Sequence, residues 1–158
     1  FPGQEHSVAE IAIDPRDPNL IHAITGGGFA GFHRSTDGGR SWTRLGTHTR
    51  DDAGRANFVS RHGWKMTSDL RTWLSIGALE ADPHHPGRLW FAEGMGVWRA
   101  DGVTPNTAAP VFHDVSDGIE EMVATDVLAI GGRVITSVWD RVGFAHDDLS
   151  VAPATQVG

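Results

Sequence analysis

Apolar and polar residues alternate along several short stretches of the chain. Ile11 and Ile13 form one such pattern, and Val134, Thr136 and Val138 form another. A period of two places these side chains on one face of a β-strand. No stretch has the i, i+3, i+4 spacing of an amphipathic helix. The pattern therefore predicts an all-β chain built from short strands.

The predicted strands belong to a unit that recurs along the chain. Residues 8–15 (VAEIAIDP) and 76–83 (IGALEADP) each read as a strand that ends in an Asp-Pro turn. A second strand follows each turn, and a Gly-rich loop then leads to a third strand. A fainter third copy has Gly131-Gly132 as its turn, with its strands at 122–130, 133–139 and 143–146.

Four antiparallel strands per unit make one blade of a β-propeller. The repeats predict blades at about residues 8–45, 58–101 and 111–150, with a boundary between two propellers near 101–117. About three blades are too few to close a propeller. We therefore expect a fragment of a larger propeller, whose open strand edges meet further blades of a parent chain or another subunit.

One turn of the first unit carries a recognisable motif. Residues 35–42 (STDGGRSW) fit S-x-D-x-G-x-x-W, the pattern known as the Asp-box, and residues 67–73 hold a possible relic of it. A short Asp side chain bonds backbone amides ahead of it, and glycine accepts turn conformations. Asp-boxes occur in sialidases, other glycosidases and non-enzymatic propellers, so the motif predicts a fold element. We expect structural roles for Ser35, Asp37, Gly39 and Trp42, with Trp42 buried.

Composition and charge limit the classes of partner and cofactor that the chain is expected to bind. The net charge is −7 and no basic run of five or more residues occurs, which argues against nucleic acid and anionic membranes. The chain has no Cys, and its paired His84 and His85 lack a converging ligand set, so we expect no metal and no cofactor. No apolar run approaches the roughly 20 residues of a membrane span, and the first residues lack the features of a signal peptide.

Two further stretches together resemble a known enzyme family. Residues 118–121 (GIEE) and 140–149 (DRVGFAHDDL) are similar to the G-I-E-E … G-D-[IV]-G-G-F-x-H-D-D-L signature of glycoside hydrolase family 74. These enzymes are xyloglucanases and related xyloglucan-oligosaccharide-specific cellobiohydrolases. Residues 76–83 resemble the I-G-A-L-x-I-D-P segment of the same family, and residues 8–45 match its blades more loosely.

The resemblance implies a secreted enzyme with two seven-bladed propellers that face each other across a cleft. Such an enzyme hydrolyses the β-1,4-glucan backbone of xyloglucan with inversion, using an acid and a base about 6.5–9.5 Å apart. The family has one catalytic Asp in each propeller, and the one in D-[IV]-G-G-F corresponds to Asp140, our candidate general acid. Trp139 is a candidate for stacking on a sugar ring. Glu93, in the corresponding loop of the preceding unit, is a candidate second carboxylate, although an ordinary solvated glutamate is the simpler interpretation.

The chain departs from the family pattern near both carboxylates. Trp139 and Val142 stand where the family has Gly, and Arg141 follows Asp140. An adjacent guanidinium would hold the Asp140 carboxylate ionised, which does not suit a general acid. The other family Asp falls at Gly26, so the partner carboxylate lies outside this chain or is absent.

Two functions therefore remain open. The first is a segment of a xyloglucanase-like glycoside hydrolase, inactive when isolated because inversion needs a second carboxylate. The second is a non-catalytic Asp-box propeller module that binds glycan or protein. A sialidase is disfavoured because its nucleophile is a Tyr and this chain contains none.

Overall fold

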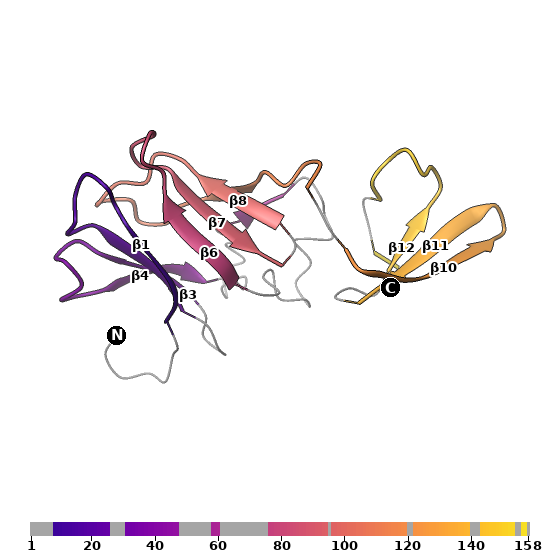
Figure 1. Cartoon of the computed structure of the whole chain (residues 1–158), viewed down its shortest axis with the longest axis horizontal. Coiled ribbons are helices and arrows are strands. Elements are labelled where there is room, and N and C mark those ends of the chain that lie inside the picture. The colour runs from indigo at the N-terminus through magenta and orange to yellow at the C-terminus, as the bar shows by residue number, and fades with distance from the viewer. Residues whose placement is uncertain are drawn as a thin grey trace.

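A computed structural model of the chain describes residues 8–25, 31–47, 58–60, 76–94, 96–119, 122–139, 143–153 and 156–157. These residues form twelve strands in three sheets, and no helix occurs among them (Figure 1). The all-β prediction is confirmed. Within these same ranges there is accordingly no helix of the length and apolarity that a membrane span requires.

The first sheet is a four-stranded antiparallel meander. Its strands follow one another in space as they do in sequence. The Asp-box turn connects the last two strands, as the sequence predicts. The strands are β1 (Val8–Ile13), β2 (Ile21–Thr25), β3 (Gly31–Ser35) and β4 (Thr43–Thr47).

The second sheet has four antiparallel strands and one parallel neighbour. The antiparallel strands are β6 (Ile76–Ala81), β7 (Leu89–Glu93), β8 (Gly96–Ala100) and β9 (Phe112–Asp114). The fourth strand lies beyond residue 101, the expected end of this unit, because a turn-rich connection separates β8 from β9. The short strand β5 (Phe58–Val59) pairs in parallel with β9 and covers its otherwise open edge.

The third sheet is a smaller antiparallel unit of β10 (Ala124–Ile130), β11 (Arg133–Val138) and β12 (Phe144–His146). Gly131 and Gly132 form the turn between β10 and β11, both with positive φ, as a tight hairpin of this kind requires. The strand order matches that of the first three strands of the other sheets. The division of the chain into blades of a closed propeller at the predicted residues stays a prediction.

The first two sheets share one hydrophobic core. Phe32 of β3 meets Phe112 of β9 edge to face, with ring centroids 5.3 Å apart, and Phe112 meets Phe91 of β7 in the same way at 6.3 Å. Their first strands, β1 and β6, also contact each other. In Figure 1 these two sheets lie side by side, whereas β10, β11 and β12 lie apart at the other end of the chain. The third sheet has its own small cluster of Val138, Phe144 and Met122.

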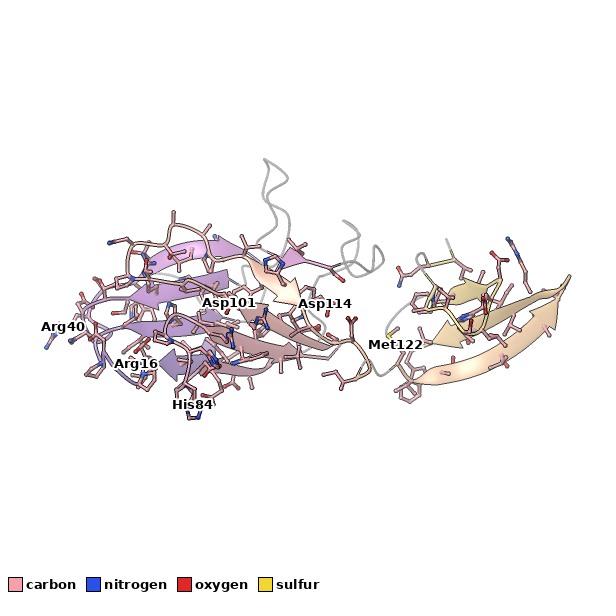
Figure 2. The ribbon with its side chains drawn as sticks, turned by 90° about the horizontal axis from the view of Figure 1, so that it is seen from above. Arg16, Arg40, His84, Asp101, Asp114 and Met122 are labelled. Atoms are coloured by element: carbon pink, nitrogen blue, oxygen red, sulfur yellow. The ribbon has the colours of Figure 1, made fainter. Side chains whose placement is uncertain are left out.

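Each of the first two sheets has two distinct ends. One end, which we call the Asp-box end, gathers the turns that follow the first and third strands. Backbone bonds tie these turns together, from Gly38 N to Asn19 O (3.1 Å) and from Val103 N to Gly87 O (2.8 Å). Figure 2 shows Arg16, Arg40 and His84 toward this end and Asp114 toward the opposite end. At the opposite end of the second sheet, β7 ends at the candidate residue Glu93.

Candidate functional site

The Asp-box turn is a closed set of short hydrogen bonds. Ser35 Oγ donates to Asp37 Oδ1 (2.7 Å) and accepts from Gly39 N (2.8 Å). Asp37 also accepts from Ser41, from its backbone N at Oδ1 (2.8 Å) and its Oγ at Oδ2 (2.6 Å). These bonds, led by that from the Ser41 hydroxyl, lower the pKa of Asp37 to about 2. The carboxylate is fully used in holding the turn, which suits the predicted structural role.

Trp42 closes the Asp-box turn from the strand side. Its indole Nε1 donates to Gly39 O (3.0 Å). The ring lies beside Gly39, whose φ of 88° is a left-handed value that disfavours other residues. The prediction that Trp42 is buried is wrong in degree, because the side chain is half-buried. It covers a turn at the edge of the sheet, and part of the residue stays accessible to solvent.

The repeated Asp-Pro turns use their carboxylates in the same structural way. Asp14 Oδ1 accepts from the backbone N of Arg16 (2.8 Å), and Asp82 Oδ1 accepts from that of His84 (2.8 Å). Asp82 also accepts from Trp90 Nε1 (3.0 Å), and this bond is the main cause of its strongly lowered pKa. Arg16 donates to Pro83 O (2.9 Å) and so joins the two turns. The sequence repeat at these positions therefore encodes turns and not chemistry.

Glu93, the candidate second carboxylate, lies at the opposite end of the second sheet. It ends β7 and is only 8% exposed, so the interpretation as an ordinary solvated glutamate is wrong. Its Oε1 accepts a hydrogen bond from Nε1 of the fully buried Trp98 in the next strand (3.0 Å). The cause is its position on the face of β7 that also carries Leu89 and Phe91, which places the side chain in the shared core.

A second carboxylate, which the sequence analysis missed, lies at the same end of this sheet. Asp114 at the end of β9 accepts from Ser60 Oγ at Oδ2 (2.6 Å) and from Ser116 Oγ and N at Oδ1 (2.5 and 3.1 Å). Ser116 Oγ in turn accepts from Val97 N (2.9 Å). The Asp-x-Ser spacing is a local turn signal that could have identified the Ser116 contact. The Ser60 contact spans 54 residues and has no such signal.

Trp139, the candidate sugar-stacking residue, follows β11 in the third sheet. Its side chain is 78% exposed, whereas the preceding Val138 packs on Phe144 in the small cluster. The alternation along the strand thus directs the indole away from that cluster. Its backbone N donates to Val123 O (3.1 Å), which fixes the start of the following connection. Asp140, together with Arg141 and Val142, lies outside the described residues.

Gly143 ends this connection and has a clear steric requirement for glycine. Its φ is 143°, and a Cβ added here would collide with the carbonyl oxygen of Thr136 on β11. Its own carbonyl accepts from Val157 N (3.0 Å). The chain thus keeps the second Gly of the D-[IV]-G-G-F pattern at a point where β11 and β12 lie too close for a side chain.

The described residues offer no group of three or more His, Asp or Glu side chains arranged to hold a metal ion. The structure brings Ser35, Asp37, Gly39 and Trp42 together in one turn. It does not bring Glu93 and Trp139 into one packed unit, because their sheets have separate clusters.

Comparison with known proteins finds xyloglucanases and other GH74 enzymes. No family model matches the chain. The xyloglucanase Xgh74A of Acetivibrio thermocellus is 28% identical over 92% of this chain, which spans 19% of that relative's length. Among solved structures, the GH74 xyloglucanase of Xanthomonas campestris is 25% identical with a TM-score of 0.72, over 95% of this chain and 21% of that one. The GH74 enzyme of Niastella koreensis gives a TM-score of 0.75 at 22% identity, over 98% and 23%.

These similarities confirm the resemblance to glycoside hydrolase family 74 and the propeller type of the fold. They extend over nearly the whole chain, including the first sheet, where the motifs matched only loosely. The chain spans about a fifth of the length of these relatives.

Proposed function

We propose that the chain is a segment of a secreted glycoside hydrolase that cleaves the β-1,4-glucan backbone of xyloglucan with inversion. One observation carries this proposal: the similarity to a xyloglucanase covers 92% of the chain and includes the stretch around Asp140. The Asp-box itself supports only the fold, since the Ser35, Asp37 and Ser41 side chains all bond within the turn.

In this proposal Asp140 is the general acid that protonates the leaving glycosidic oxygen, while a base activates water on the opposite face of the sugar. Trp139 supports this role because its exposed indole immediately precedes Asp140 and has a free face for the apolar C–H groups of a sugar ring. Gly143 supports it indirectly. The close approach of β11 and β12 fixes both ends of the connection that carries Asp140.

We assign Glu93 a structural role in the same proposal. A catalytic base must reach a water molecule beside the substrate. Glu93 is buried against Trp98, on the face that packs between the first two sheets. The base then comes from another part of the parent protein, since Gly26 occupies the position of the family's other Asp in this chain.

The separation of the third sheet supports a boundary between two propellers just after β9, at the C-terminal end of the expected range 101–117, because β9 belongs to the second sheet. Successive blades of one propeller place their first strands side by side. β1 and β6 do so, whereas the third sheet has its own cluster and lies apart in Figure 1. We therefore assign the first two sheets to one propeller and the third sheet to a second.

Exposed apolar faces support further blades as the partners of these sheets. Ile11 and Ile13 point away from the shared core and are about half exposed, and so are Val127, Leu128 and Ile130 on β10. Contiguous exposed apolar residues of this kind mark an interaction surface. A neighbouring blade, in the parent chain or another subunit, has the shape and polarity to cover them.

The decisive experiment replaces Asp140 in the full-length parent. Asp140→Asn keeps the shape of the side chain but removes the transferable proton, so turnover on xyloglucan should fall roughly 10²–10⁴-fold with binding largely retained. The matched control is Asp126→Asn, an exposed aspartate on β10 of the third sheet, which should leave turnover unchanged. Initial rates and binding isotherms on the same preparations give both quantities. Normal turnover in Asp140→Asn would rule out the assigned role.

The alternative is a non-catalytic binding module. It is favoured by Arg141, which follows Asp140, and by Gly26, which stands at the position of the family's other Asp. A binding module would bind glycan with no turnover, and Asp140→Asn would change neither quantity. In both cases Trp139→Ala should weaken glycan binding by roughly two- to tenfold, if stacking on a sugar resembles an aromatic pair. The 158-residue chain alone should not hydrolyse xyloglucan. Hydrolysis by this chain that is lost in Glu93→Gln would make Glu93 the base and overturn its structural assignment.

A further inference from the structure

A buried histidine lies between the first two sheets without any polar partner. His22 of β2 is 2% exposed, and neither its Nδ1 nor its Nε2 makes a hydrogen bond. Its ring stacks on Phe32, with centroids 5.6 Å apart and planes 22° from parallel. Both residues lie on the face of the first sheet that packs against the second. A buried imidazole with two unused nitrogens is unusual, because such groups normally find partners.

The neighbour of His22 across the sheet holds the two sheets together. Arg34 of β3 is in register with His22, and its Nη1 donates to Thr104 O (3.0 Å) and Thr107 O (2.6 Å). Both carbonyls belong to the β8–β9 connection of the second sheet. The guanidinium therefore forms a direct polar link between the two sheets, next to the imidazole.

The other charged groups near His22 give an imidazolium little support. Asp14 in the β1–β2 turn favours the charged form, and Glu10 lies on the same face of β1. From the second sheet, the packed surface is aromatic, through Phe112. The acidic groups of its adjoining turns already have partners: Asp101 binds Arg88 and Arg99, and Asp82 binds Trp90 and His85.

Burial and the charge of Arg34 together lower the pKa of His22 to about 4, against the smaller opposing effect of Asp14. The imidazole is therefore neutral in the folded protein near neutral pH. Where the sheets separate and water reaches the ring, its pKa returns toward about 6.5. The open form then binds one more proton than the closed form between about pH 6.5 and 4, so acid favours opening.

We propose that His22 makes the contact between the first two sheets acid-sensitive. Uptake of one proton places a second cation beside Arg34 and adds an N–H to the one the ring already has, so that neither ring N–H has an acceptor in the core. Separation of the sheets hydrates the imidazolium and breaks the Arg34 bonds to the β8–β9 connection. This device depends on the packing of the two sheets and not on the hydrolase activity proposed above.

The test measures hydrogen–deuterium exchange by mass spectrometry in the full-length protein that carries these residues. Exchange is followed in peptides covering β2, β3 and residues 101–108, from pH 7 to pH 4, after correction for the intrinsic pH dependence of amide exchange. The opening equilibrium of these peptides should rise by roughly two orders of magnitude over this range. In His22→Phe, which keeps an aromatic ring beside Phe32, the acid-dependent rise should disappear. The matched control His84→Gln removes an exposed histidine and should behave like the wild type.

Two results would overturn the proposal. One is a wild-type protein whose β2 and β3 peptides keep their protection down to pH 4. The other is a His22→Phe variant that loses protection in acid as the wild type does. If His22→Phe fails to fold, exchange at the imidazole C2–H of His22 in the wild type decides the question. Titration of His22 near pH 6.5 without any loss of protection would then contradict the proposal.

Discussion

The first two sheets and the third sheet share the order of their first three strands, but their side chains are buried to very different degrees. Trp98, Phe91 and Phe112 lie within a core to which both of the first two sheets contribute, with Trp98 fully buried. In the third sheet, every residue of β10 is exposed, including Val127 and Leu128. The strands are equally well paired in both regions. Backbone pairing alone therefore does not bury a blade, because each face needs a neighbouring sheet to cover it.

The two faces of the first sheet also differ in burial. Ala12 faces the second sheet and is buried, whereas Ile11 and Ile13, on the other face of β1, are about half exposed. A single strand thus has one covered and one uncovered apolar side. Stability in this chain should depend on position relative to the covered faces, and matched substitutions in the two regions can test this.

The largest expected difference is between two tryptophans. Trp98→Ala should lower the free energy of unfolding by about 3–5 kcal/mol, because it leaves a cavity in the shared core. It also removes the indole that donates to Glu93. Trp139→Ala, at a 78% exposed position of the third sheet, should change it by less than about 0.5 kcal/mol. Urea unfolding followed by circular dichroism measures both, and equal losses would contradict the role of the shared core.

The next comparison uses two turn glycines with similar backbone angles. Gly87 and Gly131 have φ of 71° and 58°, so alanine is strained at both by about 1–2 kcal/mol. At Gly87 the added Cβ would also lie 2.7 Å from Val103 O, whereas at Gly131 no atom lies within 4 Å. Gly87→Ala should therefore cost about 2–3 kcal/mol and Gly131→Ala less. Thermal unfolding of the two variants gives the difference, and a larger loss at Gly131 would show that crowding at the β6–β7 turn is unimportant.

A smaller difference is expected between two serines that both bond across a turn or strand pair. Ser35→Ala removes a buried hydroxyl and leaves the part-buried backbone N of Gly39 without its acceptor, which should cost about 1–2 kcal/mol. Ser137→Ala removes an exposed hydroxyl contact to Thr125 in the third sheet and should cost less than about 0.5 kcal/mol. The same unfolding assay applies. A Ser137 loss as large as that at Ser35 would indicate that exposed contacts matter more than burial.

The smallest expected effect is a change in the acid dependence of stability, and it should be the same for a turn of the first sheet and for the turn that follows the third sheet. The pKa of Asp37 is lowered to about 2 and that of Asp148 is also lowered, in each case mainly by a serine hydroxyl that donates to the carboxylate. Both contributions are complete above the unfolded pKa of about 3.8 and are lost as the pH falls through the lowered folded value. Asp37→Asn and Asp148→Asn should each reduce the acid dependence of stability below pH 4. An acid effect limited to the first sheet would show that these turns depend on their surroundings.

Local turns were the part of the fold that the sequence predicted best. The Asp-box residues and the two Asp-Pro turns close through contacts over two to four residues, such as Gly39 N to Ser35 Oγ and His84 N to Asp82 Oδ1. Interactions of this range depend on residue type and spacing, which a sequence displays directly. The same holds for the strand alternation and the repeat, and hence for the all-β propeller type of fold.

Long-range packing decided which side chains are buried and which polar groups pair. These properties depend on which face of each sheet packs against another sheet. It buried Glu93 against Trp98, placed Asp114 beside Ser60, and left Trp42 only half-buried at a sheet edge. It also placed His22 in an apolar contact beside Arg34, whose bonds to Thr104 and Thr107 span about 70 residues. No local pattern around these residues specifies such partners. The sequence therefore determined the turns, strands and family resemblance, and the tertiary structure decided which polar groups lie in the core.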